Sequence, residues 1–310
     1  TSSTELSQRR LDPNLGNAFD DGFDSLEVWI GTNGIAGIED EFLGQNAGDW
    51  FNMINQGIIR TGIANSDSHD RRFTRIAARN QLASTVLDPG QLSAHAEQLA
   101  SAVREGKTAG TNAPFIEIEA EGPFQGSIRR AALDIVSSTT LALDAGADVA
   151  LTVQLSTPAW APLDSVEFYI NNQPTLATAP EDAARYIVCP DRVIRAGEPG
   201  WQQRDVNVAP AIEGAIRTDI SVALTLPAVT GDTWVVAIAR GTDGVSEPLF
   251  PVLPASLDRA SNTTLDELTD GNLGEGGTPA FAFTNPLFID VNGDGWTAPG
   301  VNNASCSESP

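Results

Sequence analysis

From Phe115 onward, apolar residues recur at alternate positions, and this twofold period constrains the fold more than any other feature of the chain. Such alternation indicates strands with one buried face, and clusters of Gly, Pro, Asn and Asp separate the runs as turns would. We therefore predict a β-sandwich over residues 113–255. Its predicted strands cover residues 115–120, 148–157, 164–171, 218–226 and 233–240.

The first third of the chain has a different pattern. Residues 23–30 predict a short buried strand, and a helix should follow, capped by Asp49 and ended by Gly57. Residues 58–64 predict a second strand. This strand, loop, helix, strand order is the unit of a parallel sheet, whose working loops lie at the carboxyl ends of the strands. Another helix is predicted from about residue 89 to 105, ended by Gly106.

Length and charge exclude several classes of protein. The 310 residues suggest two domains plus a tail, which we place at residues 1–112, 113–255 and 256–310. The formal net charge of −23 would repel phosphate backbones and anionic bilayers, so nucleic acid is not an expected partner. No apolar run approaches the roughly 18–20 residues that a membrane-spanning helix needs.

The two cysteines, Cys189 and Cys306, belong to no C-x-x-C motif. They are either two unrelated thiols or a disulfide, and the sequence leaves both alternatives open. No signal peptide precedes the polar start Thr1-Ser2-Ser3, which is typical of an interior cut. We therefore expect that an upstream segment has been removed.

The loop after the second predicted strand contains Asp67-Ser68-His69. A carboxylate and an imidazole two residues apart can bind one divalent ion from the rim of a parallel sheet. Short D-x-H matches also occur by chance, and the alternative is a hydrogen-bonded loop pair.

Around this loop the chain resembles the PHP (polymerase and histidinol phosphatase) family of metallohydrolases, especially its secreted, carbaryl-hydrolase-like branch. The resemblance is specific over residues 20–120 and looser to about residue 255. Its motifs are Phe23-Asp24-Ser25-Leu26-Glu27-Val28-Trp29, Asn33-Gly34, Asp49-Trp50-Phe51, Asn55-x-Gly57, Gly62-x-x-Asn65-Ser66-Asp67-Ser68-His69, Gly106-Lys107-Thr108 and Thr111-Asn112-Ala113-Pro114-Phe115.

The resemblance implies an α/β part followed by a β part. Residues 1–112 would be the C-terminal part of a PHP-type (β/α) barrel, followed by an immunoglobulin-like β-sandwich and a tail rich in Asn, Gly and Asp. Asp67 and His69 would bind Zn²⁺ or Mn²⁺. Glu27 and Asn33 lie on the same predicted rim, where they would either support the ligands or serve a structural role.

The chain also departs from the family pattern, because the early H-x-H pair and other upstream ligands are absent. The remaining histidine, His95, lies beside an apolar helix stripe and is interpreted as a surface or packing residue. The resemblance implies a secreted, periplasmic or extracellular hydrolase of small phosphoesters or carboxyl esters. It should be inactive without a companion N-terminal fragment that supplies the missing ligands. The alternative is an extracellular, calcium-stabilised structural or binding protein on a degenerate hydrolase scaffold.

A second candidate site lies in the tail. Asp290, Asn292 and Asp294 place oxygens at alternate positions, as at the start of a calcium loop. Val301 stands where an EF-hand would have its bidentate Glu, so a complete EF-hand is not expected. The segment is therefore either part of a calcium site or an Asn/Gly turn.

Overall fold

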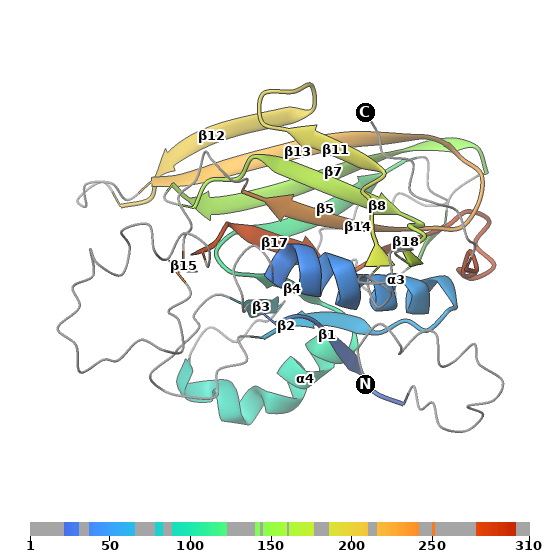
Figure 1. Cartoon of the computed structure of the whole chain (residues 1–310), viewed down its shortest axis with the longest axis horizontal. Helices are drawn as coiled ribbons and strands as arrows, with labels where there is room; N and C mark the ends of the chain where they lie inside the picture. The colour runs from blue at the N-terminus through green and yellow to red at the C-terminus, as the bar shows by residue number, and fades with distance from the viewer. Residues whose placement is uncertain are drawn as a thin grey trace.

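The computed structural model arranges the chain in three layers, two β-sheets and a layer of helices with a short parallel strand pair (Figure 1). The structure describes residues 22–30, 37–65, 78–82, 89–122, 140–142, 145–159, 161–176, 186–209, 216–241, 250–251 and 277–301.

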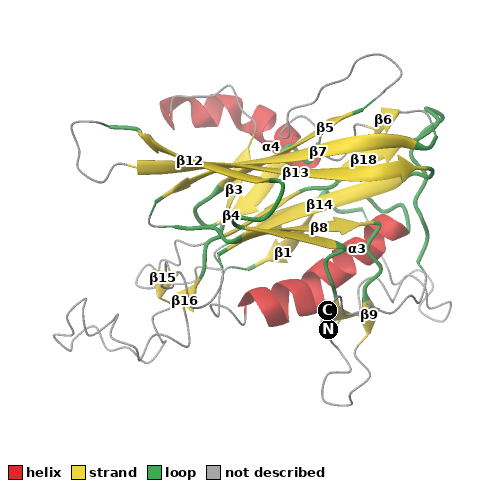
Figure 2. Ribbon diagram, turned by 90° about the horizontal axis from the view of Figure 1, so that it is seen from above, coloured by secondary structure: helices red, strands yellow, loops and turns green. Residues whose placement is uncertain are grey.

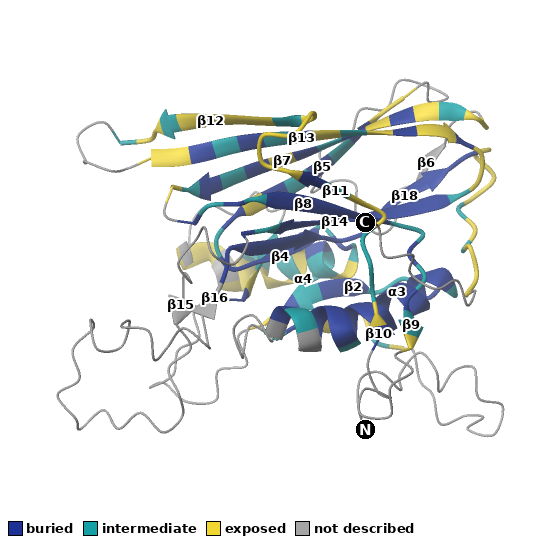
Figure 3. Cartoon of the chain, turned by 45° about the horizontal axis from the view of Figure 1, so that its top comes forward, coloured by how far each residue is buried: buried dark blue, intermediate teal, exposed yellow. Residues whose placement is uncertain are grey.

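The outer sheet is antiparallel throughout, with strand order β12-β13-β7-β5. Side chains on its inner face, such as Val149, Leu151 and Val153, are fully buried, whereas their neighbours in sequence reach solvent (Figure 3). This alternation is the twofold period of the sequence, and it arises because successive side chains of a strand point to opposite faces. The strands are β5 (Phe115–Glu121), β7 (Ala147–Pro158), β12 (Trp201–Asn207) and β13 (Ile216–Val229).

The central sheet follows the order β11-β8-β14-β17-β4-β3, and β14 also pairs with β18, which pairs with β6. Strands of the two sheets run in similar directions, as in aligned sheet packing (Figure 2). The members are β3 (Arg79–Leu82), β4 (Thr108–Thr111), β6 (Thr140–Ala142), β8 (Ser165–Ile170), β11 (Arg192–Arg195), β14 (Thr233–Arg240), β17 (Phe281–Thr284) and β18 (Leu287–Asp290).

Strand β14 is buried on both faces. Val235, Ala237 and Ala239 face the outer sheet, whereas Trp234 and Ile238 face the helices. Its sequence is therefore a nearly continuous apolar run rather than an alternation. Strands β18 and β17 pair with successive halves of β14 along one edge.

The third layer covers the free face of the central sheet. It contains η3 (Gly37–Asn46), a π-helix that runs directly into α3 (Ala47–Asn55), and the parallel pair β1 (Ser25–Trp29) and β2 (Thr61–Ala64). Every residue of α3 is buried. Aromatic rings fill the interface, with Phe51 5.0 Å from Trp234 and Phe42 5.3 Å from Phe283 between ring centroids.

The remaining described elements are small. A 3-10 turn, η5 (Pro89–His95), leads into α4 (Ala96–Arg104). The two-stranded pairs β9 (Thr175–Leu176) with β10 (Tyr186–Ile187), and β15 (Phe250–Pro251) with β16 (Gly277–Thr278), complete the list.

The predicted C-terminal part of a (β/α) barrel is wrong. The described residues form mainly β-structure with no closed barrel, and their parallel α/β part is limited to β1 and β2. The next two strands along the chain, β3 and β4, do not pair with β1 or β2. They belong to the central sheet, where they pair with each other and β4 pairs with β17. A barrel requires each strand to continue the ladder of its neighbour. Here the edge of β2 opposite β1 meets side chains instead.

Those side chains are asparagine amides. Asn285 accepts a hydrogen bond from Gly62 N (2.7 Å) and donates to the carbonyls of Gly62 (3.0 Å) and Thr108 (2.8 Å). Asn80 similarly accepts from Ala64 N (2.9 Å) and donates to Ala64 O (2.7 Å). These amides satisfy buried backbone groups that a neighbouring strand would otherwise pair.

Two glycines allow close packing beside this seam. A Cβ on Gly62 would lie 2.7 Å from the indole of Trp50, and one on Gly110 would lie 2.1 Å from the ring of Phe283. Both distances are below normal contact, so larger residues would push the aromatic rings away from the sheet.

The helix expected to have Asp49 as its cap begins at Ala47, so Asn46 occupies the N-cap position. Asp49 does not cap it; it lies in the first turn, where it is fully buried and accepts a hydrogen bond from the Tyr186 hydroxyl (3.1 Å). The predicted ends are confirmed, because Gly57 and Gly106 follow the two α-helices with φ of 80° and 68°.

Candidate functional site

The carboxyl ends of β1 and β2 form a rim, as the strand, helix, strand order predicted. The strands pair in parallel with Glu27 opposite Ile63, and a register shift follows before Trp29. Asn65 continues past β2, and its backbone N–H donates to Trp29 O (2.9 Å). Its side-chain amide donates to Glu27 Oε1 (2.5 Å). Glu27 and Asn65 therefore meet at the solvent-exposed end of the strand pair.

The rim rests on a buried base. Val28 and Trp29 pack into the aromatic interface, and the Thr61 hydroxyl donates to Val103 O in α4 (2.6 Å). Asn80 fixes Ala64, the last residue of β2, through both of its backbone groups. This support fixes the backbone that leads into the Asp67-Ser68-His69 segment.

Asp67, His69 and Asn33 lie outside the described residues. Of the predicted rim residues, the structure places Glu27 alone, with an exposed carboxylate. Within the described ranges, no group of three or more His, Cys, Asp or Glu side chains could hold a metal ion. His95 lies at the end of η5, where its ring Nδ1 is 3.2 Å from Gln98 Oε1.

The Asp290 segment forms a compact loop after β18. The Asp290 carboxylate, 3% exposed, accepts from Gly293 N (2.8 Å) and Gly295 N (2.9 Å). Asn292 accepts from Asp294 N (3.1 Å) and donates to the Asp294 carboxylate (2.9 Å). The structure therefore brings all three predicted residues into one loop, and backbone N–H groups bond to both oxygens of Asp290.

Sequence reasoning did not identify Asp232, which anchors this loop from the turn before β14. Its carboxylate accepts from Val291 N (3.0 Å) and Thr297 N (2.6 Å), 59 and 65 residues away. The local signal was only a Gly231-Asp232 turn, which carries no indication of such a distant contact.

A buried polar cluster beneath η3 was also missed. The Tyr169 hydroxyl donates to Glu167 (2.7 Å), Arg240 donates to Glu167 (3.1 Å), and Arg240 also pairs with Glu39 of η3. Burial raises the pKa of Glu167, although the Tyr169 hydrogen bond opposes this effect. Burial also raises the pKa of Tyr169 well above its usual value. The cluster joins η3 to the central sheet, and the available signal was a Glu within the apolar strand Ser165–Ile170.

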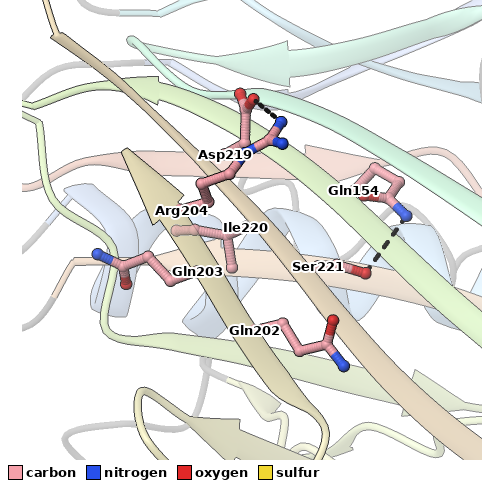
Figure 4. A pocket seen from close by; sticks show the side chains of 7 residues that line it. All are labelled: Gln154, Gln202, Gln203, Arg204, Asp219, Ile220 and Ser221. Atoms are coloured by element: carbon pink, nitrogen blue, oxygen red, sulfur yellow. Dashed lines mark hydrogen bonds and ion pairs between the residues drawn. The ribbon is translucent and has the colours of Figure 1, made fainter. Parts of the chain in front are cut away.

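A shallow hollow of about 320 Å³ lies on the outer sheet across β12, β13 and β7 (Figure 4). Arg204 and Asp219 form an ion pair in it (3.4 Å), and Gln154 donates to the Ser221 hydroxyl (3.3 Å). Its side chains can form hydrogen bonds with a polar molecule, but they do not form a nucleophile and base pair. The lining residues are Gln154, Gln202, Gln203, Arg204, Asp219, Ile220 and Ser221.

Cys189 is disulfide-bonded. The other cysteine of the chain, Cys306, lies outside the described residues. Asn172 stabilises this region by donating to Cys189 O (2.6 Å).

The fold and the rim together define a three-layer, mainly β protein with a small parallel α/β corner. No protein-family model matches the chain, and no curated protein matches it. Among the described helices, none combines the length and the apolar character required to span a bilayer.

Proposed function

We propose that this chain is part of a metal-dependent hydrolase of small esters or phosphoesters, with Asp67 and His69 as metal ligands. The observation that carries the proposal is the convergence of Glu27 and Asn65 at the carboxyl ends of two adjacent parallel strands. This convergence lies directly before the Asp67-Ser68-His69 segment in the sequence. The resemblance of residues 20–120 to PHP metallohydrolases supports the same assignment, although the barrel of that family is not seen.

The donor types fit a borderline divalent ion. Carboxylate oxygens and an imidazole nitrogen are ligands that Zn²⁺ and Mn²⁺ accept, and Glu27 presents an exposed carboxylate on the same rim. A bound ion of this kind would supply the activation of a water molecule for attack on the ester. The chain's own contribution is to hold ligands at one rim, with Asn65 orienting Glu27.

Two ligands are fewer than the three that a catalytic zinc normally has. The proposal therefore includes a companion segment of the same polypeptide that supplies further ligands, and it places the protein in a secreted, periplasmic or extracellular setting. Without the companion, we expect no metal-dependent hydrolysis.

The second candidate is an extracellular, calcium-stabilised structural or binding protein. The observation that favours it is the ordered Asp290–Gly295 loop, which Asp232 anchors to the central sheet. The disulfide at Cys189 is typical of proteins from oxidising compartments and agrees with either candidate.

Elemental analysis of the intact protein tests the first proposal. Asp67→Ala and His69→Ala should each lower the zinc or manganese content and the hydrolysis of a chromogenic ester or phosphoester. His95→Ala is the matched control, because His95 bonds to Gln98 far along the chain from the rim, and it should leave both unchanged. Unchanged metal content in both rim variants would contradict the assignment.

Calcium dependence separates the two candidates. If the protein is a calcium-stabilised scaffold, chelation should lower the thermal midpoint and expose residues 277–301 to protease. If it is a hydrolase without calcium in this loop, a calcium-selective chelator should change neither the thermal midpoint nor the protease sensitivity. Removal of zinc or manganese should then abolish hydrolysis.

A further inference from the structure

The loop after β18 contains two dipeptides that are prone to spontaneous chemical modification, Asn292-Gly293 and Asp294-Gly295. In such pairs the backbone nitrogen of the glycine can attack the side-chain carbonyl carbon of the preceding residue. Glycine allows this reaction because no Cβ hinders the approach. Asn292 and Asp294 are both exposed to solvent, so burial does not protect them.

Both attacking nitrogens are hydrogen-bonded to one side chain. Gly293 N donates to Oδ1 of Asp290 (2.8 Å), and Gly295 N donates to Oδ2 of the same carboxylate (2.9 Å). Asp290 itself is 3% exposed, at the end of a strand whose four residues are all buried. Its position is therefore set by the central sheet rather than by the loop.

We propose that Asn292 is a latent deamidation site and that Asp290 suppresses its reaction. The reaction forms a bond between Gly293 N and Asn292 Cγ, breaks the Cγ–Nδ2 bond and releases ammonia, which takes up the proton lost by Gly293 N. Water then opens the cyclic imide to aspartate or isoaspartate. Asp294-Gly295 forms the same imide with loss of water, and its reopening yields isoaspartate without a change in mass.

Two physical effects of Asp290 oppose this chemistry. Base-promoted attack requires removal of the amide proton of Gly293, and the resulting negative charge would lie 2.8 Å from the Asp290 carboxylate. The hydrogen bond also fixes the peptide plane, so the nitrogen cannot turn toward Asn292 Cγ without breaking a charge-assisted bond. The same arguments apply to Gly295 through the second oxygen.

Modification of Asn292 would change both the charge and the backbone of this loop. Conversion of Asn292 to aspartate or isoaspartate would add a negative charge beside Asp290 and Asp294 in a chain that already carries −23. Isoaspartate would also insert a methylene into the backbone of a loop that Asp232 anchors at both ends. Asp290 therefore protects the integrity of this loop whether or not the loop binds an ion.

The experiment compares deamidation of Asn292 in the folded full chain and its variants at mildly alkaline pH, with chelator present in every arm. Peptide mapping and isoaspartate detection measure the reaction. A synthetic peptide of residues 286–299 gives the unrestrained rate. The wild type should react at least several-fold more slowly than the peptide, and Asp290→Ala should approach the rate of the peptide.

Asp232→Ala is the matched control, because it removes two hydrogen bonds to the same loop without touching Gly293 or Gly295. It should react much more slowly than Asp290→Ala. If Asp290→Ala does not fold, Asp290→Asn carries the test. It keeps one acceptor oxygen without the charge and should react at an intermediate rate.

Two results would overturn the proposal. One is a wild-type rate equal to that of the peptide. The other is equal acceleration by the Asp232 and Asp290 variants, which would assign protection to general order of the loop. Neither outcome bears on the metal ligands at the rim, so this inference and the proposed function fail independently.

Discussion

The two sheets of this protein are built from different kinds of strand. In the outer sheet, β7 and β13 alternate buried and exposed residues, because one face packs on the core and the other meets solvent. In the central sheet, seven of the eight residues of β14 are buried. The helix layer covers the second face of β14. Figure 3 shows the difference as alternating colours in β13 and dark blue along nearly all of β14.

Polar side chains differ in their surroundings between the two sheets, being exposed to solvent on the outer sheet and buried in the central one. On the outer sheet, Asp219 and its arginine partners lie at the surface, where water competes with each bond. In the central sheet, polar groups such as Asn285 and Glu167 are buried and must be paired within the protein. Substitutions should therefore have large effects in the central sheet and small effects on the solvent face of the outer one.

The largest effect is expected for Trp234→Ala. Trp234 is fully buried, its ring lies 5.0 Å from that of Phe51, and its indole N–H donates to Asn55 (2.8 Å). Loss of this side chain should lower the free energy of unfolding by about 3–5 kcal/mol. Urea unfolding at constant pH measures the change.

The control for this substitution is Thr225→Ala on the solvent face of β13. It should change the free energy of unfolding by less than about 0.5 kcal/mol. Equal changes in the free energy of unfolding for Trp234→Ala and Thr225→Ala would contradict the difference proposed between the two sheets.

Asn285→Ala should have the next largest effect. It leaves Gly62 N, Gly62 O and Thr108 O without their side-chain partner in a buried seam. A buried unsatisfied group costs roughly 1–3 kcal/mol, so a total loss of about 3 kcal/mol is expected. Hydrogen exchange of the Gly62 amide should rise in parallel, and a protected amide in the variant would contradict this role.

Val222→Ala tests the inner face of the outer sheet. Val222 is fully buried against the central sheet, and truncation removes two methyl groups, at a cost of about 2 kcal/mol. Because this strand faces the core on one side only, we expect a smaller loss than for Trp234→Ala. Thermal unfolding of the two variants in parallel gives the ranking, and a larger loss for Val222→Ala would reverse it.

The smallest effects are expected from carboxyl titration, with opposite signs in the two sheets. The hydrogen bond from Arg217 lowers the pKa of Asp219, so its stabilising contribution is present above the unfolded pKa and is lost as pH falls through the folded pKa. Burial raises the pKa of Glu167, so its contribution is present below the unfolded pKa and is lost as pH rises through the folded value.

Two variants, one at the arginine partner of Asp219 and one at Glu167 itself, measure how each carboxyl makes the free energy of unfolding depend on pH. Arg217→Ala should destabilise slightly at neutral pH and not in acid, and added salt should reduce the difference. Glu167→Gln should remove the loss of stability that accompanies ionisation of Glu167. Relative to the wild type, the two variants should change the slope of unfolding free energy against pH in opposite directions. Changes of the same sign would show that the two carboxyls have the same environment.

Part of the candidate site was predictable from the sequence. The order of strand, helix and strand over residues 23–64 predicted a parallel pair with a rim at its carboxyl ends, and Glu27 does lie there. The roles of Asp67 and His69 stay predictions. Asp232 and Asn285 could not be assigned, because their partners lie 59 or more residues away, and a single Asp or Asn carries no signal of such contacts.

The sequence by itself determined the local elements. Alternating apolar residues specified β5, β7 and β13, and nearly continuous apolar runs specified β8 and β14. Glycines 57 and 106 specified the ends of the α-helices. These signals depend on neighbouring residues alone. Only the tertiary structure decided which edges pair. The apolar segment at residues 281–289, within the segment expected to be a tail, supplies β17 and β18 to the central sheet, where both pair with β14. Strand pairing depends on which faces can be buried together, and burial of β14 on both faces required these distant strands and the helix layer at once.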